Sequence, residues 1–266
     1  MKLTMLGTGN AVVTECYNTC FVLEDDGQHL MVDGGGGSGV LTQLKHAGLN
    51  WADMRHIFVT HKHIDHLLGI VWMVRMICQS MGHGSFQGEA YIYSHAEVLE
   101  LLRDMAGKLL RTDDVHHIDE RLHLVELTDG QALDIIGHQT TFFDIDSTKA
   151  RQFGFSMELD DDKRLVCCGD EPLSEAGRPY ARGAEWMLHE AFCLYSQADI
   201  YKPYEKHHST VKDACEVAEE LGVRNLLLYH TEDRNIARRK ELYAAEGKPY
   251  FTGTLWIPND LESIEL

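Results

Sequence analysis

Three histidines and a carboxylate stand within one short segment, directly after an apolar run. The run Ile57-Phe58-Val59 is typical of a buried strand, and His61-Lys62-His63-Ile64-Asp65-His66 follows it. Imidazole and carboxylate groups suit zinc and related metals, and open sites built from them hold water for catalysis. The i, i+2 spacing lets His61 and His63 converge on one ion, while Asp65 and His66 point toward a second. The alternative is a set of histidines that only line a loop. The segment therefore predicts a strand end that carries a site for two metal ions.

Strands and helices alternate along the rest of the chain. Apolar runs bounded by turn residues predict strands over 2–6, 18–23, 28–32, 55–60, 90–93, 122–127, 139–145, 153–159, 164–168, 185–188 and 223–229. Apolar residues at helical spacing predict helices over 40–48, 66–79, 96–110, 209–221 and 235–246, with Ser209 as an N-terminal cap. His116 and His117 have no useful partner spacing, so we expect them at the surface.

Four of the predicted strands end in a side chain that could bind a metal. These residues are His61 with its neighbours, Asp146, Asp170 and His230. In layered α/β folds such strand-end loops meet at one face, so residues far apart in the sequence can form one site.

A glycine-rich loop after the third predicted strand allows two interpretations. Gly34, Gly36 and Gly39 match the Gly-x-Gly-x-x-Gly pattern of dinucleotide-binding proteins, which would make the chain a nucleotide-dependent oxidoreductase. However, the preceding strand belongs to an antiparallel set, and no acid ends a second strand at the required distance. We therefore expect the loop to pass close to the metal-binding segment, where side chains would not fit.

Charge and cysteine content restrict the classes of protein. The net charge is -18, from 42 acidic and 24 basic side chains, which argues against broad adhesion to polyanions. The start lacks a signal-peptide layout, and the longest apolar stretch is interrupted by Arg75. The 7 cysteines include no Cys-x-x-Cys pair, which fits buried, reduced thiols. We expect a cytoplasmic protein with no membrane segment, folded as a single domain over 1–266.

The order of these motifs resembles the metallo-β-lactamase-fold hydrolases, and within them the ribonuclease Z-like branch. The matching segments are Gly7-Thr8-Gly9, Asp33-Gly34, the 61–66 motif, Gly169-Asp170, His189-Glu190-Ala191-Phe192, His208-Ser209-Thr210 and the apolar run ending in His230. The resemblance implies an α/β fold, a four-layer αββα sandwich of two mixed sheets flanked by helices.

The resemblance also implies a set of metal ligands. His61 and His63 would hold the first ion, Asp65, His66 and His230 the second, and Asp170 would bridge them. The family has a histidine where this chain has Asp146. A carboxylate makes the first site richer in oxygen, so zinc is expected but manganese or iron becomes possible. Our hypothesis is that Asp146 is still a ligand.

Two metal ions that share a hydroxide suit the hydrolysis of a phosphodiester. Asp65 would position or deprotonate the attacking water, and His208 is our candidate acid for the leaving group. By the resemblance, Glu190 would orient His208. The alternative for His208 is a residue that merely flanks a helix cap, with His207 equally placed.

Two departures from ribonuclease Z bear on the substrate. The segment 147–169 is too short for the basic arm that those enzymes carry, and 12–18 lacks their proline, lysine and arginine. We therefore expect a small anionic ester, or a nucleotide or RNA phosphodiester, and the branch allows for a homodimer. Other interpretations are a carboxylic or thiol-ester hydrolase of the same fold, and a non-catalytic metal-binding protein with a degraded first site.

Overall fold

The computed structural model describes all 266 residues, which divide into two compact units. The first comprises Met1–Gly7, Tyr17–Thr128 and Asp260–Leu266, and the second comprises Thr8–Cys16 and Asp129–Asn259. Each unit is built on one mixed sheet of 7 strands with helices beside it. The single domain expected over 1–266 stays a prediction.

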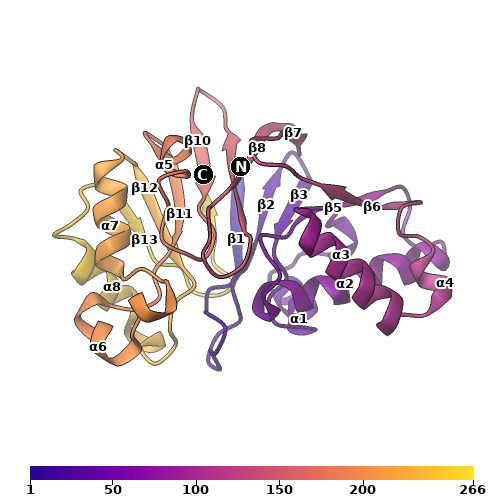
Figure 1. The fold of residues 1–266 in the computed structure, drawn as a ribbon, viewed down its shortest axis with the longest axis horizontal. Helices are drawn as coiled ribbons and strands as arrows, with labels where there is room; N and C mark the ends of the chain where they lie inside the picture. The colour runs from indigo at the N-terminus through magenta and orange to yellow at the C-terminus, as the bar shows by residue number, and fades with distance from the viewer. The chain divides into compact units, whose positions relative to one another are not determined.

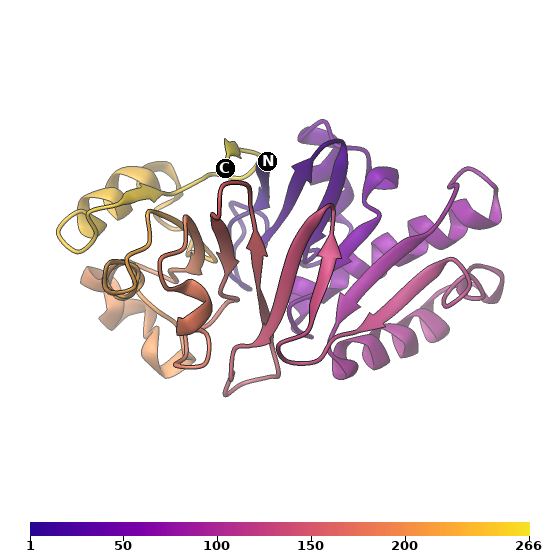
Figure 2. The same cartoon turned by 90° about the horizontal axis from the view of Figure 1, so that it is seen from above.

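The sheet of the first unit begins antiparallel and continues parallel. β1 pairs with β2, and β2 with β3, in the antiparallel set that the sequence predicts. β1 also pairs antiparallel with β14, whereas β3, β4, β5 and β6 run parallel. Because β1 and β14 are partners, the two termini lie side by side (Figures 1 and 2). In sheet order the strands are β14 (Ser263–Glu265), β1 (Lys2–Gly7), β2 (Cys20–Asp25), β3 (Gln28–Val32), β4 (His56–Phe58), β5 (Ala90–Ser94) and β6 (Leu122–Glu126).

Helices of the first unit pack their apolar sides into one core with these strands (Figure 1). They are α1 (Gly39–His46), α2 (Ile64–Gly82), α3 (Ala96–Leu109) and α4 (Thr112–Val115), with a 3-10 turn, η1 (Trp51–Asp53). Helix α2 begins at Ile64, earlier than expected, so Asp65 and His66 lie in its first turn. After α4, His116 is exposed as expected, but the expectation for His117 was wrong because its ring is buried near the end of α2.

The sheet of the second unit has the same order of pairings along the chain. Strands β7 to β10 are antiparallel, and β10 to β13 are parallel. Strand β7 was not predicted. In sheet order the strands are β13 (Thr254–Trp256), β12 (Asn225–Tyr229), β11 (Trp186–Glu190), β10 (Arg164–Cys167), β9 (Phe153–Glu158), β8 (His138–Asp144) and β7 (Ala132–Ile135).

Helices α7 and α8 cover the parallel part of that sheet (Figure 1). The cap of α7 is Thr210 and not Ser209, because the Thr210 side chain accepts from the Asp213 N–H and the Asp213 carboxylate accepts in return. The helical segments are α5 (Arg178–Ala181), η2 (Tyr195–Gln197), α6 (Ala198–Tyr201), η3 (Tyr204–Lys206), α7 (Val211–Glu220), η4 (Ile236–Arg238) and α8 (Arg239–Gly247).

Two expectations about the chain as a whole can be compared with these elements. None of the helices combines the length and apolar character needed to cross a membrane. All the cysteines are free, and only Cys16 is not fully buried. The burial of the others confirms the expectation of buried thiols for all but Cys16, and it raises the pKa of the Cys78, Cys193 and Cys215 thiols to about 12.

Candidate metal centre

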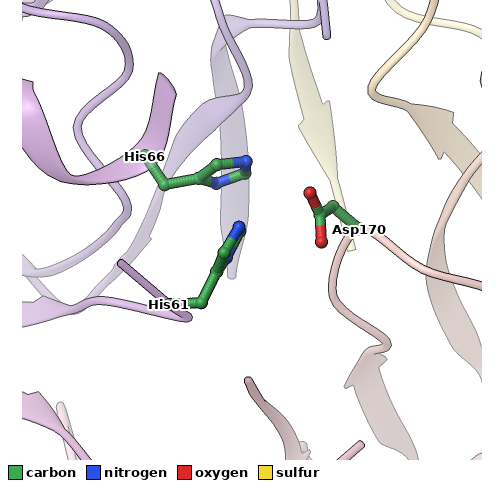
Figure 3. A group of neighbouring side chains, drawn as sticks. All are labelled: His61, His66 and Asp170. Carbon is green, nitrogen blue, oxygen red and sulfur yellow. The ribbon is translucent and has the colours of Figure 1, made fainter. Parts of the chain in front are cut away.

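The predicted metal-binding segment lies at the carboxyl end of β4 and in the first turn of α2. His61 and His66 are almost completely buried, and their ring centroids are 4.2 Å apart (Figure 3). His61 Nε2 lies 2.8 Å from His63 Nδ1, so these two rings converge as the spacing predicts. Asp65 Oδ2 lies 3.4 Å from His66 Nε2. The structure thus brings all these side chains of the first unit into one group.

A buried carboxylate fixes the orientation of two of these rings. Asp33 accepts hydrogen bonds from the Thr60 N–H and hydroxyl, each at 2.8 Å, and from His66 Nδ1 at 2.7 Å. Because the Thr60 hydroxyl donates to Asp33, it accepts from His61 Nδ1 at 2.9 Å. Both imidazoles therefore present Nε2, with its lone pair, as the donor atom.

Sequence reasoning did not assign this role to Asp33. The residue does end a strand, β3, in the same way as the predicted ligands, and that position was the available signal. Its backbone lies in the left-handed region, at φ 56. Thr60 offered no signal, since its role depends on a partner far away in the sequence.

The glycine-rich loop contacts the helix that follows the metal-binding segment. The Gly34 N–H donates to the His66 carbonyl at 2.8 Å, and the Gly69 N–H donates to the Gly35 carbonyl at 2.9 Å. A Cβ atom on Gly69 would lie 1.8 Å from the Gly34 carbonyl oxygen. This contact confirms that the loop passes where a side chain would not fit.

In the second unit, Asp170 and His230 follow the parallel strands β10 and β12. His230 Nε2 lies 3.5 Å from Asp170 Oδ2. Gln152 donates to the other carboxylate oxygen at 2.6 Å, which fixes the carboxylate that projects from the segment after β10 (Figure 3). The Tyr229 hydroxyl donates to the Gly169 carbonyl and joins the two segments. Gln152 was not predicted as part of the site.

Glu190 and His208 lie beside this pair. The ligand atoms of Glu190, His208 and His230 all lie within 4.8 Å of one another. Glu190 is completely buried, and its carboxylate accepts from the backbone N–H groups of Ser209 and Phe192. His208 Nδ1 lies 3.6 Å from Glu190 Oε2, the side on which an orienting carboxylate is expected.

Asp146 is not part of this group. It follows β8 at the same edge of the sheet, but it is exposed and its backbone is left-handed, at φ 58. Its N–H donates to Asp144 Oδ1 at 3.0 Å.

A lysine that the sequence did not single out lies next to His208. Lys149 Nζ is 3.4 Å from His208 Nε2 and 3.5 Å from the carboxylate of the buried Glu171. Glu171 also accepts from the Ser147 hydroxyl at 2.7 Å. Nothing in the spacing of Lys149 distinguishes it from an ordinary surface lysine.

The donors in each unit fit divalent metal ions. Buried imidazoles whose Nδ1 is held by a carboxylate, directly or through a hydroxyl, are the arrangement in which metal-binding proteins fix the tautomer of their ligands. In the second unit a carboxylate and an imidazole of similar burial stand together. These side chains could hold metal, and with Glu190 and His208 they provide groups able to move a proton.

Comparison with known proteins agrees with the fold that the sequence predicts. A ribonuclease Z of Methanothermobacter thermautotrophicus is 27% identical, and the match spans 100% of this chain and 97% of that protein. The metallo-β-lactamase fold protein YhfI of Bacillus subtilis superposes with a TM-score of 0.79 at 18% identity, covering 100% of this chain and 99% of that one. The short form of human tRNase Z superposes with a TM-score of 0.75 at 21% identity, covering 100% and 99%.

These relatives confirm the metallo-β-lactamase fold, the resemblance to ribonuclease Z, and the prediction of a metal-dependent hydrolase. A family profile described as anti-Pycsar protein Apyc1 matches residues 1–246. The match extends over most of the chain, from β1 to α8, and the chain therefore belongs to the family of the anti-Pycsar protein Apyc1.

Proposed function

We propose that the protein is a metal-dependent phosphodiesterase that hydrolyses a small nucleotide phosphodiester. The observation that carries the proposal is the orientation of the buried imidazoles. Asp33, directly and through Thr60, leaves Nε2 of His66 and His61 as donor atoms, which is an arrangement prepared for a metal ion.

We propose that the chain binds two divalent metal ions, with zinc as the expected metal and manganese or iron as alternatives. When bound, such ions acidify water and neutralise charge on the phosphate, which is the chemistry that diester hydrolysis needs. Imidazole and carboxylate donors support this choice of metals. The proposed ligands are His61, His63, Asp65, His66, Asp146, Asp170 and His230.

We assign the proton transfers to two side chains. Asp65 accepts the proton of the attacking water through its carboxylate, and His208 gives a proton from Nε2 to the leaving oxygen. Glu190 supports the second role, because its buried carboxylate faces Nδ1 of His208 at 3.6 Å. The ammonium of Lys149 lies 3.4 Å from Nε2 and can only donate, so Nε2 can hold the proton that it gives once Lys149 has turned to the anionic substrate.

The size and charge of the chain support a small substrate. The segment 147–169 leaves no room for an RNA-binding arm, and the net charge of -18 opposes the binding of a large polyanion. The family is named for action against Pycsar, and we propose that hydrolysis of a nucleotide phosphodiester is the chemistry behind such action.

The test combines elemental analysis with an activity assay. Protein purified without chelator is analysed for metal, and hydrolysis of a generic phosphodiester is measured with zinc, manganese and iron. Two metals per chain and turnover that is lost in His66→Ala would support the proposal. The exposed His46 provides the control, since His46→Ala should keep the metal content and the turnover of the wild type. One metal or none, without turnover under any ion, would favour a non-catalytic metal-binding protein.

The role of Asp146 has its own test. We propose that Asp146→Ala lowers the metal content, whereas Asp146→His shifts the preference from manganese or iron toward zinc, because imidazole is the softer ligand. Asp161, an exposed aspartate that is also left-handed, at φ 59, serves as the matched control. Unchanged metal content and preference in both Asp146 variants would remove this residue from the ligand set.

A further inference from the structure

A cavity of about 260 Å³ lies in the second unit, beyond the residues assigned to catalysis. Its walls come from the loop before Cys16, the segment after β11, and the turn after β12. Phe192 joins it to the reaction centre, because the ring lines the cavity and stacks on His208 with centroids 4.6 Å apart and planes 5° apart. Only the Phe192 ring would therefore separate a ligand in the cavity from His208, the proposed general acid.

The cavity presents two aromatic rings set at a right angle. Phe192 and Tyr201 have centroids 6.5 Å apart and an interplanar angle of 84°. A flat ring placed on one face would meet the edge of the other, which is a favourable arrangement for aromatic pairs. Exposed apolar side chains border the same space: Val12 is 81% exposed and Ile200 is 66% exposed. Together with the two rings, these side chains give the cavity an apolar wall.

Two cations lie over these rings. Lys206 Nζ is 5.0 Å from the centroid of Phe192, and the guanidinium of Arg234 is 5.7 Å from that of Tyr201. Both side chains are exposed and line the cavity. They give an apolar site a positive rim, which suits a ligand that combines a flat ring with a phosphate.

The two carboxylates of the cavity wall are used to hold its shape. Glu232 is buried and accepts from the Tyr201 hydroxyl at 3.0 Å, and Asp233 accepts from the backbone N–H groups of Thr14 and Glu15. Burial, together with the charge of Glu232, raises the pKa of Tyr201, so its hydroxyl keeps the proton that it donates. The loop and the ring are thus fixed before any ligand arrives.

We propose that this cavity is the base subsite of the enzyme, and that it takes the nucleobase of a small nucleotide phosphodiester by stacking on Tyr201, next to the Phe192 ring that stands at a right angle to it. The inference rests on the proposed phosphodiesterase function. It adds a binding site for the nucleobase, which the residues that act on the phosphate do not contact. Because every base has a flat face, stacking tolerates both purines and pyrimidines.

The test compares substrates that differ only in the base. Steady-state KM and kcat are measured for a purine and a pyrimidine 3′,5′-cyclic nucleotide and for the same cyclic ribose phosphate without a base. Tyr201→Ala should raise KM for both nucleotides about tenfold and leave KM for the base-free diester unchanged. Tyr201→Phe, which keeps the ring, should restore the nucleotide KM. Tyr195→Ala is the matched control, since Tyr195 is exposed, carries Lys212 over its ring, and lies outside the cavity.

A binding measurement separates this inference from the proposed function. Saturation-transfer NMR with adenosine and cytidine, which have no phosphate, should show contact of the base protons with the wild type and with Tyr195→Ala, but not with Tyr201→Ala. If no phosphodiester is hydrolysed, the proposed function fails while this binding still supports the subsite. The subsite is overturned if the wild type binds neither nucleoside, or if Tyr201→Ala changes KM for the base-free diester as much as for the nucleotides.

Discussion

The carboxylate of Asp33 controls more of the proposed metal centre than any single ligand does. It accepts from His66 directly and, through the Thr60 hydroxyl, orients His61. A metal bound by these imidazoles would therefore depend on a residue that does not touch it. In metal-binding proteins the removal of such an outer partner costs about 10- to 100-fold in affinity.

We predict that Asp33→Asn lowers zinc affinity about 10- to 100-fold. Asparagine tolerates the left-handed backbone at this position, but its NH2 group replaces one carboxylate oxygen, so the amide cannot accept all three hydrogen bonds from the Thr60 N–H, the Thr60 hydroxyl and His66 Nδ1. Competition with a chelator measures the affinity, and circular dichroism checks the fold. Asp26, exposed and left-handed at φ 45, is the control, since Asp26→Asn should bind zinc as the wild type does. Equal affinity in Asp33→Asn would show that Asp33 does not act through the imidazoles.

A second prediction for a single residue concerns the dependence of stability on pH. His189 is buried in β11, where Nδ1–H donates to the Glu190 carbonyl and Nε2 accepts from the Leu173 N–H. Burial lowers the pKa of this imidazole. Below the ordinary histidine value of about 6.5, the unfolded chain therefore binds a proton that the folded chain does not. The stability that His189 contributes is present above that pH and is lost as the pH falls toward the folded value.

We expect the free energy of unfolding to fall between about pH 7.5 and 5.5, and to fall less steeply in His189→Gln. Urea unfolding of metal-free protein at several pH values measures the slope. His46→Gln, at an exposed position, should keep the slope of the wild type. A His189→Gln slope equal to that of the wild type would contradict the assignment.

At the scale of elements, some segments with a clear apolar pattern were predicted well. Strand β3 has the predicted bounds, and α3 ends within a residue of the prediction. Strand β7 was missed because half of its residues are exposed and no apolar run marks it. The segments α4, α5 and α6 have 4 residues each, too few to show a helical period.

The candidate site follows the same rule. Strand-end residues such as Asp170 and His230 could be predicted, because a polar residue that ends an apolar run is visible in the sequence. Residues that join the site only through a contact with a distant side chain could not be predicted. Asp33, Gln152 and Lys149 become part of the site only through contacts with side chains distant in the sequence.

The contact between the glycine loop and α2 gives an element-scale prediction. In Gly69→Ala the new methyl group would meet the Gly34 carbonyl oxygen at 1.8 Å, so the loop or the helix start must shift. We expect a loss of several kcal/mol, about the cost of overpacking a tight contact, together with weaker metal binding because His66 lies in the same turn.

Gly107, in the last turn of α3, is the matched control. Nothing lies within 4 Å of a Cβ atom there, so Gly107→Ala should stabilise the protein by about 0.5 to 1 kcal/mol through helix propensity alone. Thermal unfolding of both variants measures these changes in stability. A Gly69→Ala protein as stable as the wild type would mean that the loop can move away at little cost.

For the whole molecule, charge and chain length together determine which diesters can be substrates. RNA that contacts 6 to 10 basic groups loses about 10³- to 10⁵-fold in affinity between 50 and 200 mM salt, because counterions are released. This chain has a net charge of -18, and its segment 147–169 is too short for a basic arm, so we expect no such footprint. A small diester needs only the few cations near the site, among them Lys149, Lys206 and Arg234.

We therefore predict that kcat/KM for a cyclic nucleotide falls by no more than about fourfold between 50 and 200 mM salt, because a small diester has no condensed counterions to release and only the screening of its charge changes. Precursor tRNA should be cleaved far more slowly than the cyclic nucleotide at every salt concentration, since repulsion by the net charge opposes its approach. A ribonuclease Z assayed in parallel shows that the RNA is a competent substrate. Efficient cleavage of precursor tRNA with a steep salt dependence would mean that a local basic groove outweighs the net charge, and that RNA is the substrate after all.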